Sequence, residues 1–329
     1  MIGTPKFWYK KNISSKVKTF LFFPFSIIWI LISYIKKSFI KKYKSNLKVI
    51  CIGNLTIGGT GKTPFAIYIY KILKKLGYKP VFLTRGYKGL LKGPVEVKDT
   101  HNFETVGDEA MLLSKIGPTI VSKDRLLGAK LIENHEENFN IIIMDDGLQN
   151  YQLEQDIKFL LVDKNLKFGN EYCIPAGPLR EPVNQGLKKI DALILTGKNY
   201  RKDTNFKNID IAIFNSETKI IKSPKIRKEG FLAFCGLANP NKFYELLKEN
   251  GQNVISTKSF PDHYVYKNED IDNLKSEADN QNLKLITTEK DYVKINDVMN
   301  FINVLPIEME INMKEKAVFK TFLKEKLNG

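Results

Sequence analysis

The segment from Cys51 to Leu73 reads CIGNLTIGGTGKTPFAIYIYKIL and joins an apolar run, a glycine-rich turn, a Lys-Thr pair and a helical pattern. This order is typical of a phosphate-binding loop, in which backbone N–H groups at a helix N-terminus hold phosphate oxygens. In that pattern the lysine reaches the β- and γ-phosphates and the next hydroxyl binds Mg²⁺. The expected nucleotide-binding residues are Thr56, Ile57, Gly58, Gly59, Thr60, Gly61, Lys62 and Thr63.

The loop departs from the strict consensus at one position. The first consensus glycine would fall where this chain has Thr56. Gly58 and Gly59 can still provide close backbone approach and positive φ angles. A glycine-rich helix start without a ligand would not need the Lys62-Thr63 pair, so we expect a nucleotide site.

A second motif supplies carboxylates for a metal ion. The stretch NIIIMDDGLQN is an apolar strand pattern that ends in Asp145 and Asp146. Phosphate-loop enzymes commonly hold Mg²⁺ with the loop hydroxyl and an acidic residue at the end of a neighbouring strand. The two acids could instead belong to a solvated turn, but beside the glycine loop we expect at least one of them to bind metal together with Thr63.

Apolar runs alternate with helical patterns along the first two thirds of the chain. Such alternation predicts an α/β fold with a mainly parallel sheet and helices on both faces. The helical pattern after the glycine loop covers Lys62 to Leu76 and stops at Gly77. The predicted strands are Lys48–Ile52, Val81–Thr84, Thr119–Ser122, Ile141–Met144, Phe159–Asp163, Leu193–Thr196 and Ile211–Phe214.

A polar stretch, Ile221 to Gly230, predicts a connector to a smaller α/β unit. Strands of that unit are expected at Val254–Thr257, Leu283–Thr287 and Val304–Ile307, followed by a basic C-terminal helix. The expected organisation is a membrane-associated segment at 1–46, a P-loop kinase-like domain at 47–225 and a smaller domain at 226–329.

The positive charge is concentrated near the N-terminus. The formal net charge is +16, yet the first acidic residue is Glu96, and 19 of the 52 basic residues precede it. The remaining 33 basic residues face 36 acidic ones. A basic and apolar N-terminus favours an anionic membrane face or a phosphorylated ligand over a nucleic-acid groove. The three cysteines, Cys51, Cys173 and Cys235, form no metal-site or disulfide pattern.

The N-terminal segment contains a 16-residue apolar run, Phe20 to Ile35, with lysines on both sides. It is shorter than the roughly 20 residues that a membrane span needs, and Pro24 interrupts it. No small-residue cleavage site follows, as a secretory signal would require. We expect a helix that lies in the interface with its lysines at anionic headgroups, although a core helix and a true span stay open.

Several further strings occur in a characteristic order. They are LTRGYKG (83–89), VGDEAMLL (106–113), SKDRLLGA (122–129), DDGLQNYQL (145–153), IPAGPLREP (174–182), FPDHY (260–264) and TTEKDYVK (287–294). Together with GNLTIGGTGKTP they closely resemble the tetraacyldisaccharide 4'-kinase family of lipid A biosynthesis. The resemblance extends from about Trp8 to beyond Lys294.

The resemblance implies transfer of a phosphoryl group from ATP, with Mg²⁺, to the 4'-hydroxyl of a tetraacyldisaccharide 1-phosphate. It also implies an Asp-His pair that activates the hydroxyl, matched here by Asp108 and His263, with Lys62 as a further catalytic residue. A histidine is neutral near pH 7 and can be oriented by a carboxylate. Glu109 would lie near the metal and phosphates. Three arginines match family arginines and are candidates for the substrate 1-phosphate or the ATP phosphates, because a guanidinium binds phosphate through two N–H groups; they are Arg85, Arg125 and Arg180.

The implied partners are the glycolipid substrate and an anionic membrane surface, with no nucleic acid and no evident obligate protein partner. The implied location is the cytoplasmic face of the bacterial inner membrane, with the chain bound to one leaflet.

Two other classes of protein share part of the pattern. A membrane-associated ATPase switch of the partitioning type also has the G-G-x-G-K-T sequence, but its signature lysine before the two glycines is replaced here by Ile57. A nucleic-acid-binding protein would fit the pI of about 9.4, but the basic excess surrounds an apolar segment and a glycine loop instead of following a groove.

Overall fold

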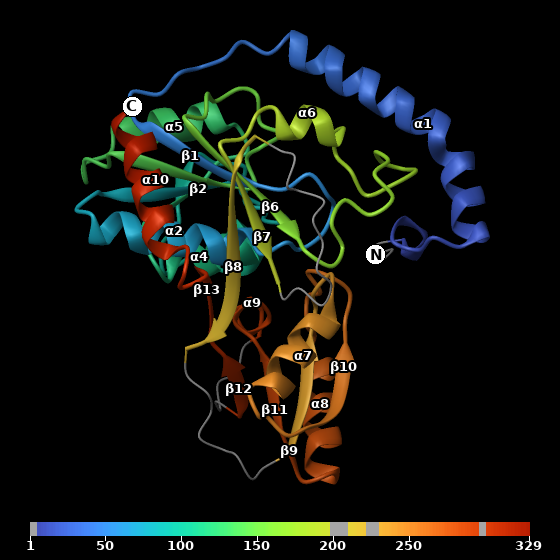
Figure 1. The fold of residues 1–329 in the computed structure, drawn as a ribbon. Helices are drawn as coiled ribbons and strands as arrows, with labels where there is room; N and C mark the ends of the chain where they lie inside the picture. Colours follow the sequence, from blue (N-terminus) through green and yellow to red (C-terminus); the bar gives the residue numbers. More distant parts are fainter. Residues whose placement is uncertain (1–4, 198–209, 222–229, 296–300) are drawn as a thin grey trace.

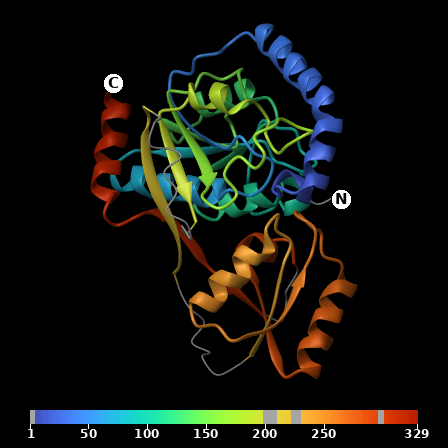
Figure 2. The ribbon, with the colours of Figure 1, turned by 45° about the vertical axis from the view of Figure 1, so that its right-hand side comes forward.

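The computed structural model describes residues 5–197, 210–221, 230–295 and 301–329. Those residues form two sheets, a nine-stranded one and a four-stranded one, that lie one beyond the other along the long axis of the molecule (Figure 1). Figure 2 shows the smaller unit standing below the larger sheet.

The larger sheet has the strand order β13-β8-β7-β6-β1-β5-β2-β4-β3. All neighbouring pairs are parallel except β3 with β4 and β13 with β8, at the two edges. The α/β fold with a mainly parallel sheet is therefore confirmed. The strands are β1 (Lys48–Gly53), β2 (Pro80–Thr84), β3 (Val95–Glu96), β4 (Thr119–Val121), β5 (Ile141–Asp145), β6 (Ile157–Asp163), β7 (Ala192–Thr196), β8 (Ala212–Ile220) and β13 (Ile307–Ile311).

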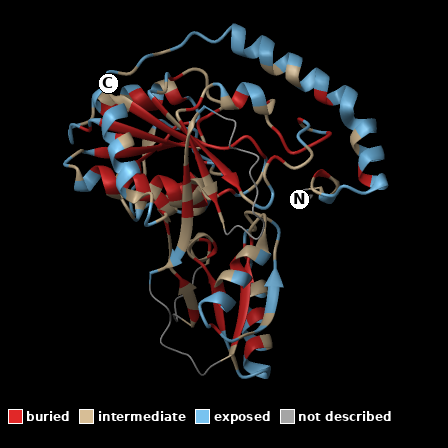
Figure 3. Cartoon of the chain, in the orientation of Figure 1, coloured by how far each residue is buried: buried red, intermediate tan, exposed pale blue. Residues whose placement is uncertain are grey.

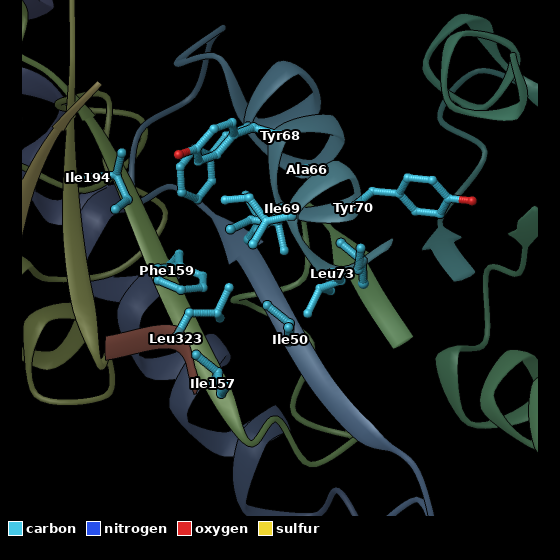
Figure 4. Close-up of a cluster of buried hydrophobic side chains, with 14 of the residues drawn as sticks. Ile50, Ala66, Tyr68, Ile69, Tyr70, Leu73, Ile157, Phe159, Ile194 and Leu323 are labelled. Atoms are coloured by element: carbon cyan, nitrogen blue, oxygen red, sulfur yellow. The ribbon is translucent and has the colours of Figure 1, made fainter. Parts of the chain in front are cut away.

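Helices cover both faces of this sheet, as expected for crossover connections between parallel strands. One face packs on α2 (Lys62–Lys75) and α10 (Lys316–Asn328), whose Leu323 reaches Phe159 and Ile50 of the sheet (Figure 4). The other face packs on α5 (Arg125–Glu133) and α6 (Val183–Leu187). Short helices η1 (Lys6–Trp8), α3 (Phe103–Val106) and α4 (Asp108–Ser114) complete this unit.

The apolar core behind α2 is rich in aromatic side chains. The rings of Phe159 and Phe319 lie 5.8 Å apart, and Phe65 lies 5.6 Å from Phe159 in an edge-to-face arrangement. All three side chains are fully buried. Truncating one of them to alanine would cost about 3–5 kcal/mol of stability, so this core fixes α2, and with it the glycine loop, against the sheet.

The smaller sheet has four parallel strands in the order β10-β9-β11-β12. They are β9 (Gly230–Cys235), β10 (Val254–Ser259), β11 (Leu283–Thr288) and β12 (Ile302–Leu305). The helix α7 (Pro240–Glu249) packs on one face and α8 (Asn268–Asn280) on the other, while α9 (Glu289–Tyr292) directly follows β11.

The C-terminal end of the chain differs from the predicted organisation. The range 226–329 was expected to form one smaller unit, but β13 pairs with β8 and α10 packs on α2, so residues 307–328 return to the larger sheet. The apolar stripe Phe319, Leu323 and Leu327 recurs every four residues and is buried there. The strand predicted at Val304–Ile307 is divided between β12 and β13. Most of the predicted connector, Ile221–Gly230, lies outside the described residues.

The N-terminal helix α1 (Ile13–Ser38) runs along the outside of the larger unit and is almost wholly exposed (Figure 3). It is 26 residues long, ten more than the apolar run in the sequence. Among the described residues it is the one helix long and apolar enough to cross a membrane, judged by length and composition.

Candidate active site

The glycine loop has the backbone geometry of a phosphate cradle. It connects β1 to α2, and both Gly58 (φ 120°) and Gly61 (φ 89°) adopt positive φ angles. Gly61 is the residue before α2 and offers no side chain to cap the helix, so the first N–H groups of α2 are left for an external anion. The Nζ atom of Lys62 lies 3.3 Å from Asn54 Oδ1 and 3.6 Å from Asp146 Oδ1.

A second loop, residues 174–182, is hydrogen-bonded to the chain around the start of the glycine loop. The N–H of Ile57 donates to the carbonyl of Pro178 (2.8 Å), and the N–H of Arg180 donates to the carbonyl of Leu55 (2.7 Å). The same loop contacts α1, since the indole N–H of Trp29 donates to the carbonyl of Arg180 (3.0 Å). The glycine loop and the N-terminal helix are thus attached to one short segment.

Thr63 and Asp145 form the candidate metal site. The hydroxyl of Thr63 donates to Asp145 Oδ2 (2.8 Å), because β1 and β5 are parallel neighbours and β5 ends at Asp145. Asp145 is fully buried, and within the described part of the chain its Oδ1 atom has no hydrogen-bond partner. Burial raises the pKa of Asp145, and the negative charge of Glu109 raises it further.

These oxygens fit a magnesium ion. A buried carboxylate oxygen without a donor and a threonine hydroxyl beside it match the hard-oxygen preference of Mg²⁺. The described residues contain no group of three or more His, Cys, Asp or Glu side chains arranged to hold a metal.

The other two predicted metal ligands have basic partners. Asp146 accepts two hydrogen bonds from the guanidinium of Arg180, at 2.9 and 3.3 Å. Burial alone would raise the pKa of Asp146, but the charges of Lys62 and Arg180 outweigh it and lower the pKa. Glu109 Oε1 lies 3.4 Å from Lys290 Nζ.

The three predicted substrate arginines occupy different environments. Arg180 lies in the site, bound to Asp146 and to Gln149 Oε1 (3.1 Å). Arg125 is 3% exposed, and its Nε atom has no partner among the described residues. Burial and the neighbouring charge of Arg85 lower the pKa of Arg125 to about 10, so it stays a cation at neutral pH. Arg85 is exposed.

Asp108 and His263 meet across the boundary between the two units. His263 Nδ1 lies 2.8 Å from Asp108 Oδ2 and 3.1 Å from Oδ1. Burial alone would raise the pKa of Asp108, but the hydrogen bond with His263 and the charge of Lys290 lower it to about 2. His263 has a φ of 56°, a left-handed conformation that is uncommon for a residue with a side chain and that marks a constrained site.

Three residues that the sequence motifs did not single out also contact His263. Its carbonyl accepts from Lys88 Nζ (3.0 Å), its ring lies 5.0 Å from the ring of Tyr87, and its Nε2 atom lies 3.1 Å from Lys290 Nζ. These residues belong to the strings LTRGYKG and TTEKDYVK, which were quoted only for the resemblance. Asn54, the partner of Lys62, was likewise missed.

One cleft of about 1360 Å³ contains most of these groups. Its walls come from the glycine loop and α2 on one side and from the segment after β9 and the His263 turn on the other. The predicted residues that line it are those of the glycine loop from Ile57 to Thr63, together with Glu109, Asp146, Arg180 and His263. The predicted residues that do not line it are Thr56, Arg85, Asp108, Arg125 and Asp145.

The cleft is lined by a phosphate cradle, by a threonine hydroxyl bonded to the buried Asp145 and by a histidine oriented by the buried Asp108. This combination defines a P-loop phosphotransferase. Comparison with known proteins agrees. A model of the family described as tetraacyldisaccharide-1-P 4'-kinase (LpxK) matches residues 18–328. The chain belongs to this family and is a kinase, which confirms the resemblance inferred from the motifs.

Individual relatives match over nearly their full length. The tetraacyldisaccharide 4'-kinase of Rickettsia bellii is 37% identical over 327 residues, with 98% of each chain covered. That of Rickettsia conorii is 37% identical over 322 residues, with 97% of this chain and 98% of the relative covered. The crystal structure of LpxK from Aquifex aeolicus in complex with ATP superposes with a TM-score of 0.75 at 28% identity, and 94% of this chain and 99% of that chain are covered.

Proposed function

We propose that this chain transfers the γ-phosphoryl group of ATP to the 4'-hydroxyl of a tetraacyldisaccharide 1-phosphate at a membrane surface. The observation that carries this proposal is the contact between His263 and Asp108 beside the cleft that the glycine loop lines. A nucleotide switch needs no base for an external hydroxyl, whereas a sugar kinase does. The acceptor would enter between the two units.

Each group in the cleft has a role that its position supports. The N–H groups of the glycine loop and Lys62 would hold the ATP phosphates and stabilise charge that develops on the transferred group. His263 would take the proton of the attacking hydroxyl, while the Asp108 carboxylate keeps the imidazole oriented.

Thr63 and Asp145 would hold Mg²⁺, which supplies positive charge to the β- and γ-phosphates when bound. Glu109 and Asp146 stay candidates for water-mediated contact with the ion, since both have basic partners in the structure.

Arg180 is the best placed of the three arginines for a phosphate group, because it lines the cleft and its guanidinium is only partly covered by Asp146. A phosphate that approached it would compete with a carboxylate already in place. Arg125 is buried and Arg85 exposed outside the cleft lining. We therefore propose Arg180 as the residue that contacts phosphate. For Arg85 and Arg125 we propose a structural role outside the cleft.

The form of α1 supports attachment to one leaflet of a membrane. Its polar positions Ser15, Thr19 and Ser26 face the protein, and Ser26 Oγ donates to the carbonyl of Cys173 (2.7 Å). Most of its apolar side chains are exposed, the reverse of a helix on a soluble core, whereas Ile30 packs against the core. Contacts with the folded unit extend from Thr19 to Lys37, which lies 4.8 Å from the Tyr151 ring. Such a helix lies along the protein, as an interfacial anchor would.

The lysines at both ends of α1 would meet anionic headgroups. We place this surface on the cytoplasmic face of the bacterial inner membrane because ATP is available on that side. The arrangement would hold the cleft at the level where a glycolipid headgroup meets water.

A transfer assay tests the proposal. Purified full-length chain is incubated with Mg²⁺, γ-labelled ATP and a tetraacyldisaccharide 1-phosphate in detergent micelles, and the label is followed into lipid. The expected product carries a second phosphate at the 4' position. ATP hydrolysis without label in lipid, or turnover stimulated only by a protein partner or nucleic acid, would contradict the proposal. The variant His263→Asn serves as the matched control for background transfer.

A further inference from the structure

Lys290 is the second residue of α9, and its ammonium group lies beside the Asp108-His263 pair. Its Nζ atom lies 3.1 Å from His263 Nε2, 3.4 Å from Glu109 Oε1 and 4.0 Å from Asp262 Oδ1. The side chain is 20% exposed. The ammonium group therefore occupies the position from which an acceptor hydroxyl would reach Nε2.

The contacts of His263 specify its tautomer. The carboxylate of ionised Asp108 can only accept, so the Nδ1 atom of His263 carries the proton of that hydrogen bond. An ammonium group can only donate, so Nε2 must accept from Lys290. The imidazole is therefore neutral, with a lone pair on Nε2. This is the form that can take a proton from a hydroxyl.

We propose that Lys290 is a positioning residue that holds His263 as the neutral Nδ1–H tautomer, with the Nε2 lone pair directed into the cleft. When the acceptor hydroxyl arrives, Lys290 moves off Nε2 and the hydroxyl takes its place. The proposal rests on the proposed function for the identity of the hydroxyl. The tautomer itself follows from the contacts alone.

The surrounding charges explain why the lysine is needed. Asp108 at Nδ1 and Asp262, whose Oδ1 lies 3.9 Å from Nε2, both favour a second proton on the ring. Lys290 at Nε2 and Lys88, which donates to the His263 carbonyl, oppose it. Among the described groups, Lys290 is the cation in direct contact with Nε2, the nitrogen that must keep its lone pair.

Lys290 also has two carboxylate partners, Glu109 and Asp262, that can hold its ammonium group away from Nε2. When a hydroxyl approaches Nε2, the ammonium can stay paired with Glu109 or Asp262 without leaving the site. Burial alone would lower the pKa of Lys290, but the charges of Glu109, Asp108 and Asp262 raise it, so it stays a cation throughout. Displacement by substrate exchanges one partner for another and leaves no unpaired buried charge.

The alternative is a simple tether, in which Lys290 joins the smaller unit to Glu109 of the larger one. A tether would affect stability and the contact between the units. It would not determine whether the Nε2 atom of His263 is protonated. The two roles therefore differ in a measurable property of the imidazole.

The first test is the imidazole nitrogen spectrum of the full-length chain labelled with ¹⁵N-histidine, recorded near pH 8. The chain has three histidines, and His263→Asn identifies the relevant signals. We expect a protonated Nδ1 and a bare Nε2 in the wild type. Lys290→Met should move the ring toward the doubly protonated form, and Lys290→Arg should retain the wild-type pattern.

Two results would overturn the inference. One is a wild-type ring that carries its proton on Nε2, a measurement that does not depend on any variant folding. The other is a Lys290→Met spectrum identical to that of the wild type. Lys248→Met, an exposed lysine in the last turn of α7, is the control for the loss of a lysine from the smaller unit.

The second test is kinetic. Lys290→Met should lower kcat by about 10- to 100-fold, less than the about 10²- to 10⁴-fold expected for loss of the base itself. KM for ATP should stay close to that of the wild type, and Lys290→Arg should recover much of kcat. A rise in KM for ATP with kcat unchanged would assign Lys290 to nucleotide binding and overturn the inference. If the chain transfers no phosphate to the glycolipid at all, the proposed function fails while the nitrogen spectrum still decides the tautomer.

Discussion

His263 and Asp108 are 155 residues apart in the sequence, yet their side chains lie 2.8 Å apart. Asp108 begins α4 of the larger unit, and His263 sits in a left-handed turn after β10 of the smaller unit. The contact therefore depends on how the two units are placed against each other. Any reaction that needs both residues also needs that placement.

Removing either member of this pair should abolish most activity without unfolding the protein. His263→Asn is the best substitution because asparagine tolerates the positive φ of this position. We expect kcat to fall by about 10²- to 10⁴-fold in His263→Asn and in Asp108→Asn, the usual range for loss of general-base catalysis. Nucleotide affinity, measured by calorimetry, should be unchanged. Activity close to wild type in either variant would remove that residue from the mechanism.

The same pair should make stability depend on acid pH. The folded-state pKa of Asp108 is about 2, below its ordinary value of 3.8, so its contribution is present at neutral pH and is lost as pH falls from about 4 toward 2. A shift of this size corresponds to about 2 kcal/mol. The denaturation midpoint of the wild type should therefore approach that of Asp108→Asn as pH falls. A difference that is constant from pH 7 to pH 3 would contradict this.

The hydroxyl of Thr63 should matter for both metal binding and stability. Thr63→Val keeps the shape but leaves Asp145 Oδ2 without its donor, and the loss of a buried hydrogen bond costs about 1–3 kcal/mol. Activity should fall and should recover in part at higher Mg²⁺ concentration, because ion affinity is what the change weakens. Thr63→Ser restores the hydroxyl and should restore both. An unchanged Mg²⁺ titration in Thr63→Val would exclude this hydroxyl as a ligand.

Gly61 is predicted to tolerate no side chain. Its φ of 89° is strained for any other residue, and an added Cβ atom would collide with Met309 Cε of β13. Gly61→Ala should lower the melting temperature and weaken ATP binding. Adding Met309→Ala removes the collision but not the backbone strain, so the double variant should recover only part of the loss. Full recovery would mean that the positive φ is unimportant.

The outward face of α1 should drive membrane binding. The side chains of Phe20, Ile28 and Leu31 are exposed by 78%, 53% and 55%. Burial of each apolar side chain contributes about 1.5 kcal/mol or more, so a triple change to serine should weaken binding to anionic vesicles at least about 100-fold. The matched control replaces Ile255, Val265 and Val318, which are also exposed but lie away from α1. Equal loss in both variants would reject α1 as the anchor.

Much of the larger sheet could be predicted because its strands are continuous apolar runs. The predicted strands from Lys48 to Phe214 correspond to β1, β2, β4, β5, β6, β7 and the first part of β8. The two-residue β3 was missed, since so short a strand leaves almost no pattern. The apolar stripe of α10 could be read from the sequence. The sheet against which it packs could not, because a stripe shows only that one face of the helix is buried.

The N-terminal helix shows a similar limit. The apolar run suggested a membrane anchor, but the sequence did not show that Ser26 and Thr19 would face the protein and bind the 170–176 segment. Small polar residues in an apolar run have no evident direction until a partner surface is known. Their hydrogen bonds with Cys173 and Asn170 give the helix its orientation.

The sequence by itself determined the glycine loop, the Lys62-Thr63 pair and the acidic end of β5, because each is a contiguous pattern whose local backbone geometry sets its chemistry. Only the tertiary structure decided that Lys290 and Asp108 bind opposite nitrogens of one imidazole, and that β13 and α10 return to the first sheet. The physical reason is that side chains from distant segments meet only when the two sheets pack. The free energy of that packing is spread over many residues, so no single sequence motif predicts it.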